Sequence, residues 1–198
     1  MFGFVLIAAS TLMHLYVFWR AATVPALARR VPRKALGVAG VGLWASVVAA
    51  RTVAHDASAP AARALETVGM NWLATVFLLF VALLVVELLT GFGLALPKLA
   101  PRLRGAALVG GLAFAALAMV QGIRAPVVSE HEVALAGLPR ELDGTVLVAL
   151  TDLHLGSQFG AEWLGERAGQ VRALRPDLVV LVGNNFDGRD GPAEEMLP

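Results

Sequence analysis

The sequence predicts an α-helical membrane domain of four transmembrane helices over residues 1–123, followed by an incomplete α/β domain over residues 124–198. Three observations predict this division. Hydrophobic residues make up 58% of the 198 residues and charged residues only 16%, whereas a soluble domain carries ~25% charged residues. The first part contains 10 Lys/Arg and 3 Asp/Glu, and the second contains 6 Lys/Arg and 12 Asp/Glu. Apolar stretches long enough to cross a bilayer occur in the first part alone.

This composition also excludes several classes of protein. The chain is too apolar for a disordered protein or for a basic nucleic-acid-binding domain, so we expect no nucleic acid among its partners. The sequence contains no cysteine, which excludes disulfide scaffolds, thiolate metal sites and cysteine nucleophiles.

Four apolar stretches predict the transmembrane helices, at residues 1–19, 35–50, 69–89 and 105–123. Each comes close to the ~20 residues that a helix needs to cross the hydrocarbon core. None carries the polar residues at every third or fourth position that a soluble helical bundle would show. The first stretch has no basic residue before it, unlike a cleaved signal peptide, so we expect it to remain as a helix.

The short loops between these helices predict the orientation of the chain. Five basic and no acidic residues lie between positions 20 and 34, and three basic and no acidic residues lie between positions 97 and 104. Basic short loops remain in the cytoplasm. We therefore expect a multi-pass protein of a bacterial cell membrane, with the lipid bilayer as a partner and with both termini outside the cytoplasm.

Two ionisable residues, His14 and Glu87, lie within the predicted spans. The predicted orientation places both near the cytoplasmic ends of their helices. Because a charge in lipid is costly, we expect both side chains to face the bundle interior and to contact each other. A functional proton or lipid-headgroup site is the alternative. Several small residues are expected to allow close approach of the helices, namely Gly37, Gly40, Gly42, Gly110 and Gly111.

The polar part predicts a strand–helix–strand unit. Residues 127–135 alternate in character and predict a first strand. Residues 145–150 and 178–182 are continuous apolar runs, as expected of strands buried on both faces. Residues 161–174 have apolar side chains at helical spacing, and Pro176 predicts the end of that helix. This order predicts a βαβ unit with parallel strands and a right-handed crossover.

Candidate metal ligands stand in the two loops that follow the buried strands. In open α/β sheets, functional groups gather at the carboxyl ends of the strands. Asp152 and His154 follow the first of these strands, and Asn184 and Asp187 follow the second. A carboxylate with an imidazole suits Mn, Fe or Zn, and an acidic group from the second loop would bridge to a further metal ion. The alternative is a capping Asp152 beside a solvated His154, with Asp187 in an Asp-Gly turn.

These motifs resemble a known family. Thr-Asp-Leu-His-Leu-Gly at residues 151–156, then a helix, then Arg-Pro-Asp-Leu-Val-Val-Leu-Val-Gly at residues 175–183, is similar to the opening of the calcineurin-like metallophosphoesterases. The nearest subgroup is the bacterial membrane-associated YkuE-like type, and the Arg-Ala-Pro at residues 124–126 fits what precedes the motif there. The resemblance covers residues 124–188 and implies metal-dependent hydrolysis of a phosphomonoester or phosphodiester. The envelope location suggests lipid or cell-wall phosphoesters as substrates.

The resemblance also implies roles for individual residues. Asp152 and His154 would ligate the first of two divalent metal ions. The family has a bridging aspartate at the position that Asn184 occupies here, and a neutral amide bridges two cations poorly. Asp187 matches an acidic residue that supports the site rather than ligating a metal.

Two of the family's later metal motifs, a Gly-Asn-His-Asp/Glu loop and a Gly-His-x-His loop, are missing from the sequence. We therefore expect the N-terminal part of a longer enzyme or a truncated relative, with little or no turnover in this chain. One alternative is a non-catalytic membrane protein whose polar segment binds a partner. Another is a transporter built around His14 and Glu87, although the four spans show neither an internal repeat nor a broken helix.

Overall fold

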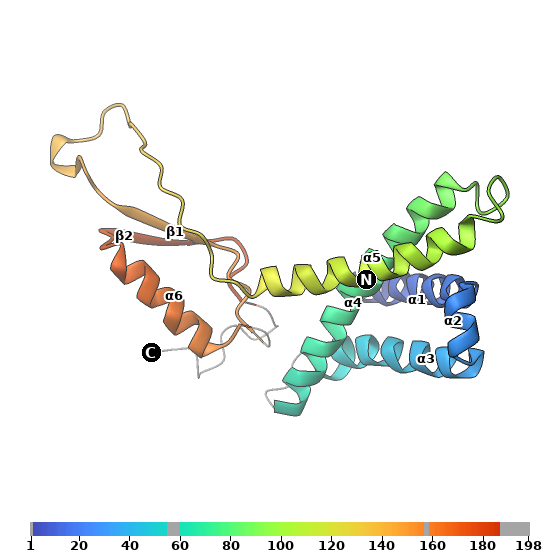
Figure 1. The fold of residues 1–198 in the computed structure, drawn as a ribbon. Helices are drawn as coiled ribbons and strands as arrows, with labels where there is room; N and C mark the ends of the chain where they lie inside the picture. The colour runs from blue at the N-terminus through green and yellow to red at the C-terminus, as the bar shows by residue number, and fades with distance from the viewer. Residues whose placement is uncertain (1, 55–59, 157–158, 187–198) are drawn as a thin grey trace. The chain divides into compact units, whose positions relative to one another are not determined.

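The computed structural model describes residues 2–54, 60–156 and 159–186, and the chain divides into two compact units, Met1–Ile123 and Arg124–Pro198 (Figure 1). The first unit contains the helices α1 (Phe2–Ala21), α2 (Pro25–Arg30), α3 (Arg33–Ala49), α4 (Pro60–Leu89) and α5 (Ala100–Gly122), with a π-helical turn η1 (Ala50–Ala54) after α3. The second unit contains a 3-10 turn η2 (Arg140–Leu142), strand β1 (Leu147–Thr151), helix α6 (Ala161–Ala173) and strand β2 (Leu178–Val182).

Four helices of the first unit are long and apolar enough to span a membrane, as the sequence predicts. They extend further into the basic loops than expected. Helix α1 continues to Ala21, and α5 begins at Ala100 rather than at residue 105. Arg20 and Arg104 therefore lie within helices and not in loops, and this difference of a few residues decides what both side chains contact.

Helix α4 is also longer than predicted, because it begins at Pro60 rather than at residue 69. The added segment contains Ala, Leu, Arg and Glu, which are good helix formers, and proline is favoured at the first helical position. The segment is more polar than a membrane span, and the apolar pattern alone does not include it.

The core of the membrane unit lies around α4, which contacts α1, α3 and α5. Val76, Leu79 and Leu83 of α4 and Val17 of α1 are almost fully buried and form one cluster. The outer surface is apolar as well, since Phe4 and Val109 are 79% and 70% exposed. Such a surface would be an aggregation hazard in water and is suited to lipid.

Glycines allow close helix contact at only some of the expected positions. A Cβ atom at Gly111 would lie 2.9 Å from the side chain of Leu79, and one at Gly40 would lie 3.0 Å from the ring of Phe18, so the prediction is confirmed there. It is wrong for three glycines, because no atom lies within 4 Å of a Cβ built on Gly37, Gly42 or Gly110.

The second unit is built on one pair of parallel strands, with Leu147 opposite Leu178 and Thr151 opposite Val182. The sequence predicts this strand–helix–strand order, and the connecting helix α6 lies along one side of the two strands (Figure 1). Helix α6 ends beside Arg175, whose φ is +52°, and Pro176 follows, which is the predicted stop.

The predicted strand at residues 127–135 is wrong. These residues are extended but pair with no strand among the residues that the structure describes. Val127 is 89% exposed, and Val133 is 70% exposed. A strand needs a neighbour for its backbone hydrogen bonds, so alternating residues alone do not form one.

Candidate functional site

The candidate metal ligands lie at the carboxyl edge of the β1–β2 pair. The register that ends with Thr151 opposite Val182 places the residues after both strands side by side. The backbone N–H of Asp152 donates to the carbonyl of Val182 at 3.1 Å, and that of His154 donates to the carbonyl of Asn184 at 3.1 Å. The two loops are therefore held together by backbone hydrogen bonds beyond the strands.

The structure brings Asp152 and Asn184 together directly. The backbone N–H of Asn184 donates to Oδ1 of Asp152 at 3.0 Å. Gly183 makes this contact possible, because a Cβ on it would lie 2.5 Å from the same Oδ1, and its φ of +75° suits glycine. The Asp152 carboxylate thus lies directly against the backbone of the second loop.

The Asp-x-His segment holds its two polar side chains outward and its apolar ones inward. Asp152 and His154 are exposed, whereas Leu153 and Leu155 are 8% and 2% exposed. Leu155 also bridges to Phe186 after β2. The buried leucines therefore anchor the loop and leave the carboxylate and the imidazole on its accessible side.

Both candidate ligands have an unusual backbone conformation. The φ angles of Asp152 and His154 are +52° and +48°, in the left-handed region, which is uncommon for residues other than glycine but several times more frequent for Asp and His than for most others. Each such residue costs ~1–3 kcal/mol and persists where the surrounding structure imposes it, which is common at functional sites. Phe92 and Arg175 have the same conformation, so it is not confined to this loop.

The donor types at this edge are ones that a divalent metal ion accepts. Asp152 offers a carboxylate, His154 an imidazole and Asn184 an amide oxygen, which together suit Mn, Fe or Zn. No cluster of three or more His, Asp or Glu residues forms within residues 2–54, 60–156 and 159–186. Asp187, the predicted supporting residue, lies outside the described residues.

Asn185 is a further residue of this edge that the sequence pattern does not single out. Its Nδ2 donates to the carbonyl of Gly183 at 3.3 Å, while its Oδ1 is buried and has no hydrogen-bond partner among the residues that the structure describes. A buried acceptor of this kind usually finds a donor. The pair of asparagines in the sequence is the one signal that marks this position.

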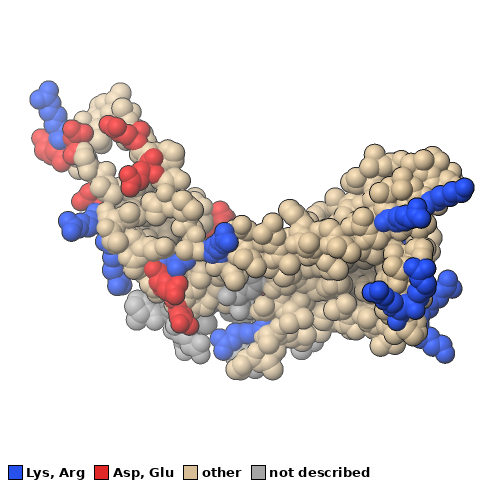
Figure 2. Space-filling view, viewed as in Figure 1, with Lys and Arg blue, Asp and Glu red and all other residues tan. Residues whose placement is uncertain are grey.

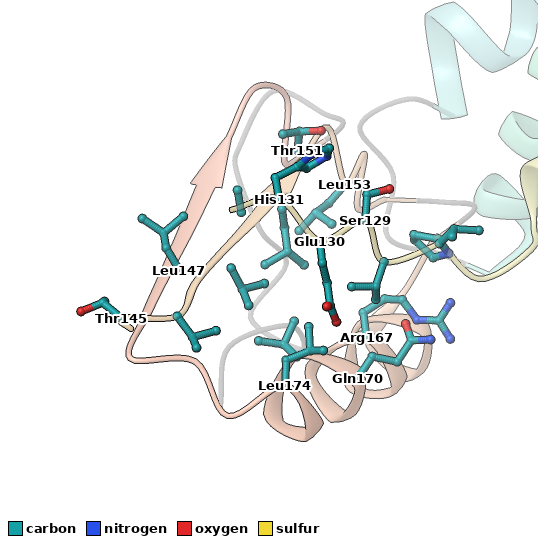
Figure 3. A pocket seen from close by; sticks show the side chains of 18 residues that line it. Ser129, Glu130, His131, Thr145, Leu147, Thr151, Leu153, Arg167, Gln170 and Leu174 are labelled. Atoms are coloured by element: carbon teal, nitrogen blue, oxygen red, sulfur yellow. The ribbon is translucent and has the colours of Figure 1, made fainter. Parts of the chain in front are cut away.

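A pocket of about 680 Å³ lies beside the edge, between β1, α6 and the extended segment 126–131 (Figure 3). It reaches the edge at Thr151 and Leu153 but includes neither Asp152 nor His154. Figure 3 shows His131 next to Thr151 at that end of the pocket. The pocket follows the apolar length of β1, so it is a neighbour of the candidate metal site and not the site itself.

In the membrane unit, His14 faces the bundle interior as predicted, with 4% exposure. Its Nδ1–H donates to the carbonyl of Ser10 at 2.8 Å, and its Nε2 accepts from Nε1 of Trp72 at 2.7 Å. Both ring nitrogens are therefore paired. The predicted contact between His14 and Glu87 is wrong, because each side chain has other partners.

Glu87 is fully buried and binds two arginines from neighbouring helices. Its Oε1 accepts from Nε of Arg104 at 2.6 Å and its Oε2 from Nη2 of the same guanidinium at 3.1 Å. Arg20 approaches Oε2 at 3.2 Å through Nη2. Arg104 also donates to Thr23 at 3.3 Å, and the Arg20 guanidinium lies 4.2 Å from the Trp19 ring. A two-pronged arginine is a better partner for a carboxylate than a histidine.

The signal for this Arg–Glu–Arg cluster is present in the sequence. Glu87 is the single acidic residue within the predicted spans, and Arg20 and Arg104 border the ends of two other spans. The predicted orientation places all three at the same end of the bundle. Since a buried carboxylate needs a cation, the nearest arginines were the stronger expectation.

Comparison with known proteins supports in part the resemblance to metallophosphoesterases. Over 83 residues, which are 42% of this chain, the sequence is 35% identical to a Danio rerio protein named "Transmembrane protein with metallophosphoesterase domain". The match covers 19% of that protein, so the chain spans about a fifth of the length of the relative it matches. No family model and no solved structure matches the chain. The chain is therefore similar in part to a transmembrane protein that carries a metallophosphoesterase domain.

Proposed function

We propose that the chain is the membrane-anchored opening part of a metallophosphoesterase of the YkuE-like type, and that Asp152, His154 and Asn184 contribute ligands to a divalent metal ion. The strand register, which places the loop of Asp152 and His154 beside the loop of Asn184, is the observation that carries the proposal. The name of the relative supports the reaction class.

The chemistry of this edge follows from its donors. A divalent metal ion held there would activate a phosphoryl oxygen as a Lewis acid. Asp152 would supply the negative charge, with its Oδ1 held by the Asn184 N–H. His154 would supply a neutral nitrogen ligand. Asp152, His154 and Asn184 would provide three donors, fewer than the four to six that Zn or Mn takes, so the remaining ligands would come from other residues.

The substrate class follows from the proposed location. The proposed reaction is hydrolysis of a phosphomonoester or phosphodiester, and a domain tethered outside a bacterial cytoplasmic membrane meets envelope lipids and cell-wall polymers. Those phosphoesters are the proposed substrates.

A second candidate is a non-catalytic membrane protein whose polar segment binds a partner. The neutral Asn184, at a position where the resemblance implies a bridging aspartate, favours it. The two candidates differ in metal binding, because a partner-binding surface has no need of a metal ion at the Asp152 edge.

Metal binding tests the proposal through Asp152. Titrating the detergent-solubilised chain with Mn²⁺, followed by electron paramagnetic resonance, should show binding that weakens about tenfold or more in Asp152→Asn. The lost charge is worth at least ~1.4 kcal/mol of affinity. The amide keeps an oxygen that can accept the Asn184 N–H, so the loop should stay folded.

The matched control is Asp143→Asn, which changes the same charge in the turn before β1 and should leave the affinity unaltered. Equal affinity in the Asp152→Asn variant and the unmodified chain would contradict the metal assignment.

Orientation in the membrane is a separate prediction. The basic residues of the two groups lie between the end of α1 and the start of α3 and at the start of α5, so the segment after Arg124 should lie outside the cytoplasm. Alkaline phosphatase fused after Arg124 should be active, and a reporter that works only in the cytoplasm should be inactive at the same position. The opposite pair of activities would show that the chain is inserted the other way.

A further inference from the structure

A groove of about 480 Å³ runs between α1 and α3 on the surface of the membrane unit. Helix α1 contributes Leu15, Phe18 and Trp19, and α3 contributes Gly37, Gly40 and Trp44. Arg33, the first residue of α3, closes one end of the groove. The volume lies within the ~300–1,000 Å³ that is typical of small-molecule sites.

The polar side chains at the deep end of the groove are already paired within the protein. Nε1 of Trp44 donates to Oγ1 of Thr11 at 2.8 Å, and that hydroxyl donates to the carbonyl of Ile7 at 2.7 Å. Both nitrogens of His14 are also occupied, by Ser10 and Trp72. The deep part of the groove therefore offers no polar group to a ligand and suits an apolar one.

The Arg33 end has the opposite character. Arg33 is exposed and makes no ion pair within the part of the chain that the structure describes. Lys and Arg gather at this end of the membrane unit in Figure 2, which shows no acidic side chain there. An occupant that is apolar along its length and anionic at one end complements the groove.

The length of the groove matches one leaflet of a bilayer. Arg33 and Trp44 are eleven residues apart on α3, which is ~17 Å at ~1.5 Å per helical residue. Half of the ~30 Å hydrocarbon core is ~15 Å. A chain lying in the groove would thus run from the interface at Arg33 to about the middle of the membrane.

We propose that this groove binds one anionic phospholipid, with an acyl chain along Gly37 and Gly40 and the phosphate at Arg33. The open space over Gly37, where no atom lies within 4 Å of a Cβ position, is where the acyl chain lies. The site is independent of the metal edge, so it stands whether or not the second unit is part of an enzyme.

Brominated lipids test this proposal, because bromine quenches tryptophan and both Trp19 and Trp44 line the groove. The full chain is placed in phosphatidylcholine nanodiscs with increasing fractions of dibrominated phosphatidylglycerol or dibrominated phosphatidylcholine. Half-maximal quenching should need about fivefold less of the anionic lipid, which is the effect of one basic side chain at such an interface.

Two pairs of variants distinguish binding in the groove from the effects of a lost charge or an added side chain elsewhere. Arg33→Gln should abolish the preference for the anionic lipid, whereas Arg30→Gln, which removes the same charge outside the groove, should retain most of it. Gly37→Leu should fill the groove and reduce quenching by the anionic lipid. Gly42→Leu adds the same side chain at another open position of α3 and should leave quenching unchanged.

Equal quenching by the two lipids, or the same loss in Arg33→Gln and Arg30→Gln, would overturn the proposal. A second copy of the chain over the groove would overturn it as well. The sequence has no cysteine, so a disulfide between two Gly37→Cys chains in nanodiscs would show directly that a second copy of the chain covers the groove.

Discussion

Replacing Glu87 by glutamine should lower the free energy of unfolding of the membrane unit by about 3–5 kcal/mol. This is the usual cost of removing one partner of a buried ion pair. The carboxylate is 0% exposed and contacts Arg20 and Arg104, which are 9% and 7% exposed. Its loss would leave two buried guanidinium groups without an anion. Unfolding by sodium dodecyl sulfate in mixed micelles, followed by circular dichroism, measures the change.

The control is Glu66→Gln, since Glu66 and Glu87 are the acidic residues of α4. Glu66 is only half-buried, so removing its charge should change the free energy of unfolding by only ~0–1 kcal/mol. Replacing Arg20, Glu87 and Arg104 together by methionine should restore much of the stability, because well-packed apolar residues can substitute for a buried cluster of charges. Similar small losses for Glu87→Gln and Glu66→Gln would show that the cluster does not hold the bundle together.

Replacing Asn184 by aspartate should increase metal binding at the carboxyl edge of β1 and β2. In a two-metal site the ions lie ~3.5–4 Å apart, and two double charges at that distance repel by about 4 kcal/mol even with the dielectric of water. A carboxylate shared between the ions offsets this repulsion with a full negative charge, whereas the amide of Asn184 supplies only a dipole.

Metal analysis of the equilibrated protein should therefore find at most one Mn²⁺ per chain with Asn184 and either a second ion or about tenfold tighter binding in Asn184→Asp. Asn185→Asp adds the same charge at the next residue and should have the smaller effect. An unchanged metal count and affinity in Asn184→Asp would mean that this position has no part in metal binding.

The sequence predicts the second unit well where the signals are local. The run at residues 178–182 forms β2 with those same bounds, because a β-branched apolar run lies between Asp177 and Gly183. Asp152 and His154 alternate with Leu153 and Leu155, and this alternation accounts for the exposure that the two polar side chains share in the structure. The left-handed backbone of these residues was not predictable, because it depends on contacts with the loop after β2.

Features that depend on residues far apart in the chain are harder to predict from the sequence. The pattern at residues 127–135 is typical of a strand, but pairing is decided by which other strands are available. Similarly, whether Arg20 and Arg104 contact Glu87 depends on α1 and α5 continuing a few residues past their apolar segments. The positions of helix ends predicted from a sequence are uncertain by about this much, so the sequence shows the three charged residues of the cluster but not the contacts between them.

The most direct test of the metal site at the Asp152 edge is electron spin-echo spectroscopy of Mn²⁺ bound to the full chain. The modulation of a directly coordinated histidine nitrogen should be present in the unmodified protein and lost in His154→Gln. It should persist in His131→Gln, which removes the other histidine of the second unit. A histidine signal that survives in His154→Gln, or no histidine signal from bound Mn²⁺ in the unmodified protein, would contradict the account.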